Sequence, residues 1–271
     1  MLAFLASSAA AAGLELTPKA ATGPLRNVRL ACLALVLNFG LAPLFAWLLT
    51  KVLPLAPGHA IGLILLGGAA GAPFLPKLAT VAQSPLASAV ALMMLLTAGT
   101  LLFMPLVLPL MISGLQADAW TIARPLLLFI LVPLLAGMLI QCGTTLPAAR
   151  LARWLGRLSS ACLLLLLVLL VTLHFGALLS VIGSGAIFAV VLYLLLLFVC
   201  GWMLGGFVRA DRGNLALATI ARNFGAAFVS AAGSFSDPNV LTMLVVSAIV
   251  CLVVCFLAAG WLRRQAPRSP A

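Results

Sequence analysis

Apolar runs of about 20 residues recur along the whole chain and are separated by short polar joints. A run of that length, folded as a helix, spans the hydrocarbon core of a bilayer. Charged residues make up only 7% of the chain and the mean hydropathy is +1.30. Soluble domains contain roughly 25% charged residues, and a soluble core cannot bury so much apolar surface. The sequence therefore predicts an all-α polytopic membrane protein with a single integral membrane domain over residues 1–271.

Nine transmembrane spans are expected from these runs. The first, at residues 1–16, is about 24 Å long as a helix, and its alanine-rich end resembles the cleavage site of a signal peptide. The sequence Glu15-Leu-Thr-Pro18 is more typical of a helix exit, which favours a short first span. The third expected span lies at about 58–71 and is completed by a short half-helix at about 77–83. The others lie at about 27–50, 85–112, 120–141, 151–175, 185–208, 213–236 and 238–262, and residues 263–271 form a basic cytoplasmic tail.

The basic residues fall in alternate joints. Nine spans place twelve of the fifteen Lys and Arg residues on one side of the membrane, with Lys51 and Arg124 on the other side and Arg222 inside it. Cytoplasmic joints are enriched in Lys and Arg. We therefore expect the N-terminus outside and the C-terminus in the cytoplasm, in a bacterial-type inner (plasma) membrane. The twelve are Lys19, Arg26, Arg29, Lys77, Arg150, Arg153, Arg157, Arg209, Arg212, Arg263, Arg264 and Arg268.

Two of the expected spans are interrupted. Pro73 and Pro76 lie three residues apart just before Lys77, and each removes a backbone donor and clashes with the preceding helical turn. The eighth span carries Arg222 and Asn223 at its middle. An arginine near the bilayer centre costs roughly 3 kcal/mol unless it faces protein or water. Both features are typical of broken transporter helices that bind substrate or ion. The alternative for Arg222 is a structural arginine that pairs with backbone carbonyls.

The two breaks occupy equivalent positions in two halves of the chain. Spans one to four match spans six to nine, which predicts a first repeat over about 1–112 and a second over about 151–262. The helix at about 120–141 is unpaired. Matching spans are five apart, an odd number, so the two repeats have opposite orientation. Inverted repeats with interrupted helices are the sequence pattern of secondary transporters, whose sites lie near the bilayer midplane.

Several short motifs resemble those of the bile acid:sodium symporter family. They are Leu16-Thr-Pro18, Asn38-Phe-Gly-Leu-Ala-Pro43, Gly62-Leu-Ile-Leu-Leu-Gly67, Ala221-Arg-Asn223 and Phe235-Ser-Asp-Pro238. The resemblance covers nearly the whole chain. It implies a fold of two inverted five-helix repeats, with a core domain that contains two crossing broken helices and a separate panel domain. This chain is similar to a nine-helix variant that lacks the first helix.

The resemblance carries the sodium site of the family over only in part. Asn38 stands where sodium-coupled members have a polar amide, and Asn223 matches the Asn of their second broken helix. Arg222 stands where those members have Gln, and their sodium-binding Glu falls at Ala218. Their Ser-Asn pair at the first break falls near Leu75-Pro76. A neighbouring guanidinium repels sodium. We therefore expect no cofactor and assign no metal ligand. Sodium stays open as a bound ion, although its usual ligands are not matched.

Two cations at the breaks favour an anion site instead. Lys77 and Arg222 would both face the crossing of the broken helices and attract an organic anion, and half-helix N-termini would add positive potential. The alternative for Lys77 is a cytoplasmic charge of the positive-inside pattern. A desolvated lysine also titrates and so allows proton coupling, whereas arginine stays charged. Thr97 and Thr100 lie one turn apart and either line the cavity or bond back to helix carbonyls. The candidate substrate- or ion-binding residues are Asn38, Pro73, Lys77, Thr97, Thr100, Arg222 and Asn223.

The sequence favours a secondary active transporter of a small organic anion, coupled to protons or uncoupled. A channel-like protein, or a partner-dependent membrane protein without transport of its own, is the alternative, although pore-lining charge rings and repeated filter motifs are absent. An enzyme is not expected, because no paired catalytic residues lie at mid-span. The net charge of +11 does not predict nucleic-acid binding, because the basic residues lie in joints between spans. The sequence carries no signal for an oligomeric state.

Overall fold

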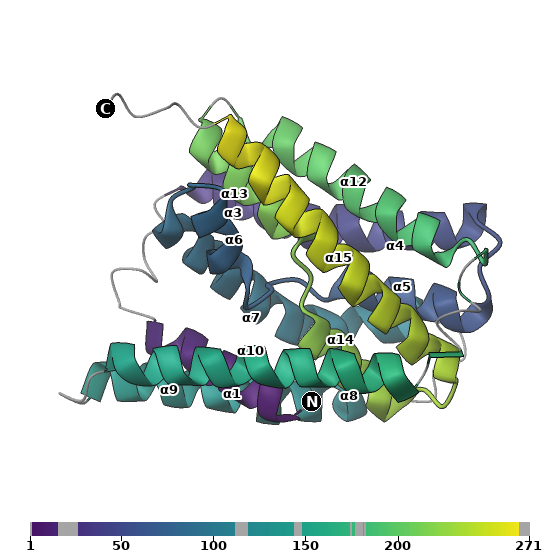
Figure 1. The fold of residues 1–271 in the computed structure, drawn as a ribbon, viewed down its shortest axis with the longest axis horizontal. Helices are drawn as coiled ribbons and strands as arrows, with labels where there is room; N and C mark the ends of the chain where they lie inside the picture. Colours follow the sequence, from purple (N-terminus) through teal and green to yellow (C-terminus); the bar gives the residue numbers. More distant parts are fainter. Residues whose placement is uncertain are drawn as a thin grey trace.

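The computed structural model describes residues 2–15, 27–111, 119–143, 148–173, 175–176, 181, 183–206 and 208–265, and the regular structure in these residues is helical (Figure 1). Lys19, Arg26, Asp118, Arg268 and the end of the expected basic tail lie outside the described residues. The helices are α1 (Leu2–Glu15), α3 (Val28–Val36), α4 (Ala42–Val52), α5 (Pro57–Gly68), α6 (Leu75–Val81), α7 (Leu86–Met111), α8 (Ala119–Leu126), α9 (Val132–Gly143), α10 (Ala148–Leu173), α12 (Ala186–Leu204), α13 (Arg209–Ile220), α14 (Phe224–Ser234) and α15 (Pro238–Arg264).

Two π-helical turns join pairs of these helices into continuous rods. The turn η2 (Leu37–Leu41) links α3 to α4, and η3 (Leu127–Leu131) links α8 to α9. A π-turn inserts one extra residue into a helix and is frequent at functional sites. Pro43 follows η2 and Pro133 follows η3. A proline ring inside a helix clashes with the carbonyl four residues earlier, and the wider π-turn leaves room for the ring there.

Within the described residues, six helical segments are long and apolar enough to span a bilayer. They are Val28–Val52, Leu86–Met111, Ala123–Cys142, Ala186–Leu204, Asp211–Ala232 and Pro238–Arg264. They match the second, fourth, fifth, seventh, eighth and ninth expected spans. The first and sixth expected spans are the helices α1 and α10, and the third consists of α5 and α6. The polytopic helical architecture is therefore present, while the count of nine spans and the inverted repeats stay predictions.

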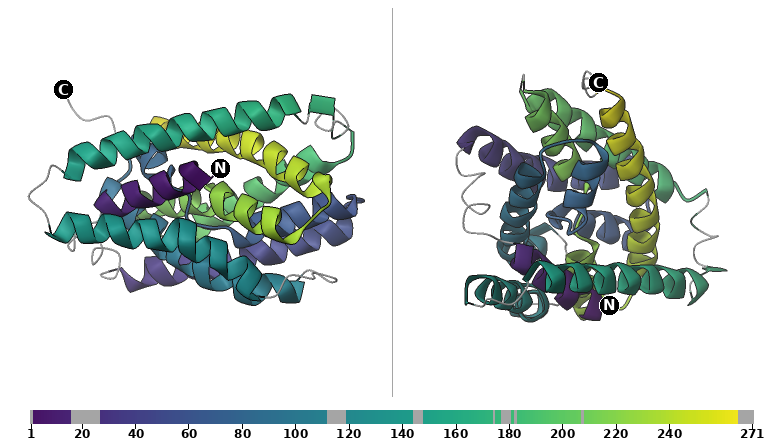
Figure 2. Two further views of the ribbon diagram at one scale, coloured as in Figure 1. Left: turned by 90° about the horizontal axis from the view of Figure 1, so that it is seen from below. Right: turned by 60° about the vertical axis from the view of Figure 1, so that its left-hand side comes forward.

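The helices form two layers. α1, α8, α9 and α10 lie together along the lower side of Figure 1, and the remaining helices form a thicker layer above them, an arrangement that Figure 2 also shows. We call the lower layer (α1, α8, η3, α9, α10) the panel, and the upper layer (α3 to α7 and α12 to α15) the core. The two layers touch mainly where α8 packs against α7 and α14.

Glycines allow α1 to pack closely on α9. A methyl group on Gly13 would overlap the Leu134 carbonyl oxygen, and one on Gly137 would overlap the Ala10 carbonyl oxygen. Small residues at such crossings let two membrane helices approach backbone to backbone. The segment α1 is therefore an integral part of the panel.

The helix ends of the core gather on two opposite faces. On one face, Asn27 donates to Asp211 at 3.0 Å, and Gly213 lies beside Ser84 and Leu262. On the other face, Gly58 lies against Asp237 and Asn239. This grouping agrees with the alternation of spans expected from the sequence. We call the first the basic face, because Arg29, Arg212, Arg263 and Arg264 lie near it along the chain.

Candidate functional site

The first predicted break is present between α5 and α6. The helix α5 ends at Gly68, three residues earlier than expected, and residues 69–74 are not helical. Gly71 has a φ of +78°, a backbone conformation that side chains with a Cβ rarely adopt. Pro73 lies in the break, while Pro76 is the second residue of α6, where a proline leaves no intrahelical donor missing.

The second predicted break is present between α13 and α14. The helix α13 ends at Ile220 and α14 begins at Phe224, so Arg222 and Asn223 lie in the unwound segment. Asn223 caps α14, because its Oδ1 accepts a hydrogen bond from the Ala226 backbone N–H at 3.1 Å. An asparagine at this position satisfies one of the donors that a new helix leaves free.

The two breaks meet. The backbone N–H of Asn223 donates to the Ala69 carbonyl at 2.9 Å, and its Nδ2 donates to the Gly71 carbonyl at 3.3 Å. From α7, Thr100 accepts from the Ala70 N–H and donates to the Ala70 carbonyl, both at 2.9 Å. Unwound backbone groups inside a membrane protein need such partners, because no water is present to bind them.

The two threonines of α7 support the first break. Thr97 donates to the Gly71 carbonyl at 3.0 Å and to the Met93 carbonyl at 2.7 Å. It also lines a cavity, whereas Thr100 is fully buried and does not. The alternative drawn from the sequence, hydroxyls that bond helix carbonyls, therefore describes part of the arrangement. Both hydroxyls donate to carbonyls of the first break, and Thr97 also donates to a carbonyl of its own helix.

Arg222 is fully buried and is the largest side chain without solvent exposure. Its Nε donates to the Leu66 carbonyl at 3.0 Å, and its Nη2 donates to the Gly67 carbonyl at 2.5 Å. Its Nη1 donates to Asn38 Oδ1 at 2.9 Å and to the Thr219 carbonyl at 3.2 Å. The guanidinium therefore pairs with carbonyls, as the structural alternative predicts, and it lines neither of the cavities described below.

The π-turn η2 brings Asn38 to Arg222. Asn38 is fully buried within that turn. Its Nδ2 donates to the Ala34 carbonyl at 3.0 Å, which fixes the amide so that Oδ1 faces the guanidinium. Asn38 thus links the rod formed by α3 and α4 to the crossing of the broken helices.

A cavity lies between the panel and the core. It has a volume of about 180 Å³, and Lys77 lines it together with residues of α1, α7 and α10. The Lys77 ammonium donates to Ser160 Oγ at 2.8 Å. The other lining residues are Phe4, Ser8, Ala11, Ala12, Pro73, Phe74, Pro76, Met93, Gly156, Ser159 and Ser160.

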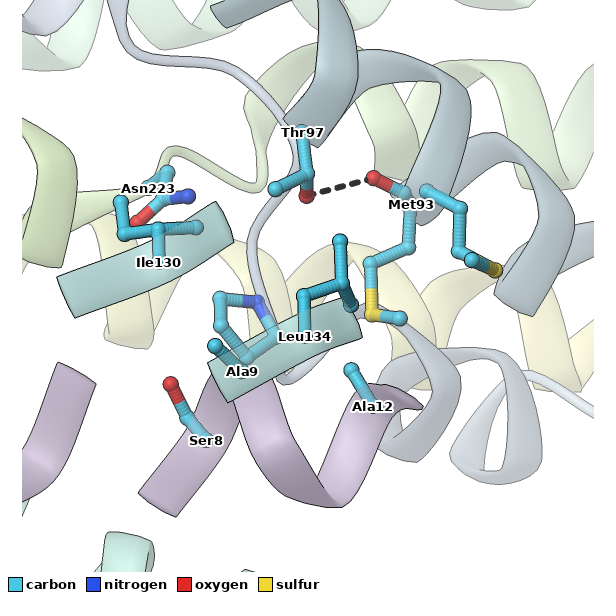
Figure 3. Close-up of a pocket in the computed structure, with 10 residues that line it drawn as sticks. Ser8, Ala9, Ala12, Met93, Thr97, Ile130, Leu134 and Asn223 are labelled. Atoms are coloured by element: carbon cyan, nitrogen blue, oxygen red, sulfur yellow. Dashed lines mark hydrogen bonds between the residues drawn. The ribbon is translucent and has the colours of Figure 1, made fainter. Parts of the chain in front are cut away.

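The cavity narrows toward the crossing. A small pocket of about 20 Å³ shares Ser8, Ala12, Pro73 and Met93 with the larger cavity and ends at residues that include Thr97 and Asn223. Figure 3 shows Thr97 and Asn223 above the panel residues Ile130 and Leu134. The two cavities therefore adjoin through these shared residues, one lined by Lys77 and the other by Asn223 of the second break.

The structure separates the two cations that the sequence suggests as neighbours. Lys77 lines the wide part of the cavity, whereas Arg222 lies within the core behind Asn223. The sequence reasoning missed Ser8, Ser159 and Ser160. Their signal is two adjacent serine pairs in otherwise apolar spans, Ser7-Ser8 and Ser159-Ser160.

Residues 2–181 match the family model described as Sodium Bile acid symporter family. The chain belongs to the sodium bile acid symporter family. The match covers the panel and the first break but ends before α12, so the second break and Arg222 lie beyond it. Comparison with curated proteins returns no match. Membership of this family, together with the apolar helices, makes the protein an integral membrane transporter of the symporter type.

Proposed function

We propose that the protein is a secondary active transporter of a small organic anion and works by alternating access. The observation that carries this proposal is the pair of adjoining cavities between panel and core, one lined by Lys77 and the other by residues of the two meeting breaks. Broken helices at a cavity are the usual place for substrate in secondary transporters, because their free backbone groups replace water.

The chemistry of the cavity supports an anionic, partly apolar substrate. Lys77 supplies a positive charge, and the serines at positions 8, 159 and 160 supply hydroxyl groups. The described residues that line the cavity include no Asp or Glu. Phe4, Phe74 and Met93 add apolar wall, which suits the carbon skeleton of an organic acid. A carboxylate or sulfonate at Lys77 would take the place of the Ser160 hydroxyl as its hydrogen-bond partner.

The two ends of the panel make different contacts with the core. α8 packs against α7 and α14, at the end of the molecule where α7 finishes and α14 leads to Asp237. The larger cavity lies beside α6 and beside Gly156, Ser159 and Ser160 in the N-terminal half of α10. With the orientation proposed from the basic residues, the cavity opens to the cytoplasm and the contact of α8 closes the outside. Rocking of the panel against the core would exchange the two states.

Uptake into proteoliposomes tests this proposal. A screen of organic anions by thermal stabilisation of the purified protein supplies the substrate, because bound ligand raises the melting temperature. We expect saturable uptake of the anion that stabilises the protein. Sodium and pH gradients are varied separately to identify the coupling ion.

Variants of Lys77 test whether this lysine binds the anion. We expect Lys77→Gln to raise the KM for the anion by about two- to fivefold, because Lys77 is exposed in the structure and an exposed ion pair is worth up to about 1 kcal/mol. Lys77→Arg keeps the charge and is expected to keep most of the affinity. Lys51→Gln removes a cation on the opposite side and serves as the matched control. Flux that does not saturate would favour the channel alternative, and unchanged uptake in Lys77→Gln would remove this lysine from the site.

A further inference from the structure

The oxygen atoms around Arg222 come from the C-terminal ends of two half-helices. Leu66 and Gly67 lie in the last turn of α5, and Thr219 lies in the last turn of α13. The last carbonyls of a helix have no partner within it, and the helix dipole makes that end partly negative. Asn38 Oδ1 adds a fourth oxygen from the π-turn η2. We call these four oxygens the cage.

The cage is neutral apart from its dipoles. The acidic side chains that the structure places are Asp211, which accepts from Asn27, and Asp237, which caps α15. Both lie at helix ends, and among the described residues neither bonds to Arg222. A buried charge is tolerated only when surrounding groups replace its water. Four oxygens from three separate elements do this for the guanidinium, so the cage is built for a cation.

We propose that the Arg222 guanidinium is the resident cation of this cage and fastens the two broken helices to each other. The same oxygens would otherwise suit a hard monovalent cation, which prefers carbonyl and amide oxygens. Sodium, the ion in the family description, does not fit while Arg222 is present. Every cage oxygen already accepts from the guanidinium, and a second positive charge at this distance is repelled.

The consequence for transport rests on the proposed function. A transporter whose crossing is held by its own arginine needs no sodium ion there to complete its substrate site. The proposal about the cage itself concerns stability, so it is tested without any substrate.

The experiment compares melting temperatures of the purified, detergent-solubilised protein and of Arg222→Ala. Each is measured in equal concentrations of sodium chloride and choline chloride, and in choline chloride with millimolar methylguanidinium. We expect the wild-type melting temperature to be the same in sodium and choline. Arg222→Ala is expected to melt at least about 3 °C lower and to regain part of that loss with methylguanidinium, which can enter the vacated cage.

Arg212→Ala is the matched control. Arg212 lies on the same half-helix, donates to the Trp202 carbonyl at 2.9 Å and stacks on the Trp202 ring, but it is not enclosed by helix C-terminal ends. Methylguanidinium should not restore its stability. A sodium-specific rise in the wild-type melting temperature would overturn the proposal. So would an Arg222→Ala protein that methylguanidinium stabilises no more than it stabilises Arg212→Ala.

If Arg222→Ala does not fold, the melting temperatures of a second pair of variants test the cage proposal. Arg222→Lys keeps the positive charge without the planar fork, and Arg222→Gln keeps a similar length without the charge. The cage proposal expects Arg222→Lys to be the more stable of the two. If Arg222→Gln melted at the same temperature as Arg222→Lys or higher, the cage would not require a positive charge. Failure of this test leaves the anion uptake experiment untouched, and failure of uptake leaves the cage untouched.

Discussion

At the scale of single residues, most of the polar groups inside the membrane hold the crossing together. Asn38, Thr100 and Arg222 are buried, and they form hydrogen bonds with backbone groups or with each other. Thr97 and Asn223 have a double role, because each supports a break and also lines the narrow pocket. Lys77 differs, since it lies at the wide part of the cavity with a hydroxyl as its partner.

Replacement of Asn38 tests the link between the π-turn and the crossing. Asn38→Ala removes an oxygen that accepts from a buried guanidinium, and a hydrogen bond to a charged group is worth about 2 kcal/mol. We expect the melting temperature to fall by about 4–8 °C, whereas Asn38→Asp should keep more stability because it retains the acceptor. Thr50→Ala, in the same rod, removes a hydroxyl that only bonds back to the Trp47 carbonyl and is the control. Equal melting temperatures for Asn38→Ala and Thr50→Ala would contradict this role.

At the scale of elements, the first break depends on a glycine that the sequence pattern did not single out. Gly71 has a left-handed backbone, and a methyl group there would overlap the Thr97 backbone nitrogen. Left-handed backbone costs a residue with a Cβ roughly 1–2 kcal/mol even without a clash. The break at residues 69–74 therefore depends on the turn at Gly71 as well as on Pro73.

Gly71→Ala should lower the melting temperature and reduce anion uptake together, because Thr97 must move away from the narrow pocket. We expect a loss of at least about 2 kcal/mol, measured by thermal unfolding and by uptake on the same preparation. Gly260→Ala in α15 is the control, since a methyl group there meets no atom within 4 Å. A Gly71→Ala protein as stable as Gly260→Ala would show that the break does not need this turn.

The contact between α1 and α9 allows a second test at the same scale. Gly137→Ile would force α1 away from α9, because the Gly137 position already touches the α1 backbone. Overpacking of this kind costs about 1–3 kcal/mol, so we expect a lower melting temperature and a lower yield of folded protein. Gly260→Ile is the matched control. Normal stability of Gly137→Ile would mean that α1 is not held in the panel by this crossing.

At the scale of the whole molecule, the panel and the core are the units that would move. They touch mainly through α8, and the larger cavity lies between them beside α6, α1 and α10. Two of the residues that line the cavity, Lys77 of α6 and Ser160 of α10, are exposed. In the proposed mechanism, a change of contacts between panel and core would expose the narrow pocket to the other side of the membrane, while the helices of both layers stay intact.

Thiol labelling of a cysteine at position 160 reports on this arrangement. In a background where the exposed Cys32 and Cys142 and the other native cysteines are replaced, Ser160→Cys should react with a membrane-impermeant reagent from the cytoplasmic side. Saturating anion is expected to slow that reaction at least about tenfold, because it fills the cavity next to Lys77. Leu128→Cys, exposed on the panel surface, gives the background rate. Labelling of Ser160→Cys only from the outside would reverse the proposed orientation.

The sequence by itself determined the helical membrane class and the two breaks, because these follow from local properties. Apolar length sets the spans, and the prolines at positions 73 and 76 and the arginine at 222 interrupt them wherever the rest of the chain lies. The tertiary structure alone decided what Arg222 and Lys77 contact. Two of the four partners of Arg222 are carbonyls of α5, more than 150 residues earlier in the chain, and a backbone carbonyl has no signature in sequence. Lys77 meets Ser160 because panel and core lie side by side. Composition predicts that a buried charge needs partners, but only the packing of the helices determines which groups these partners are.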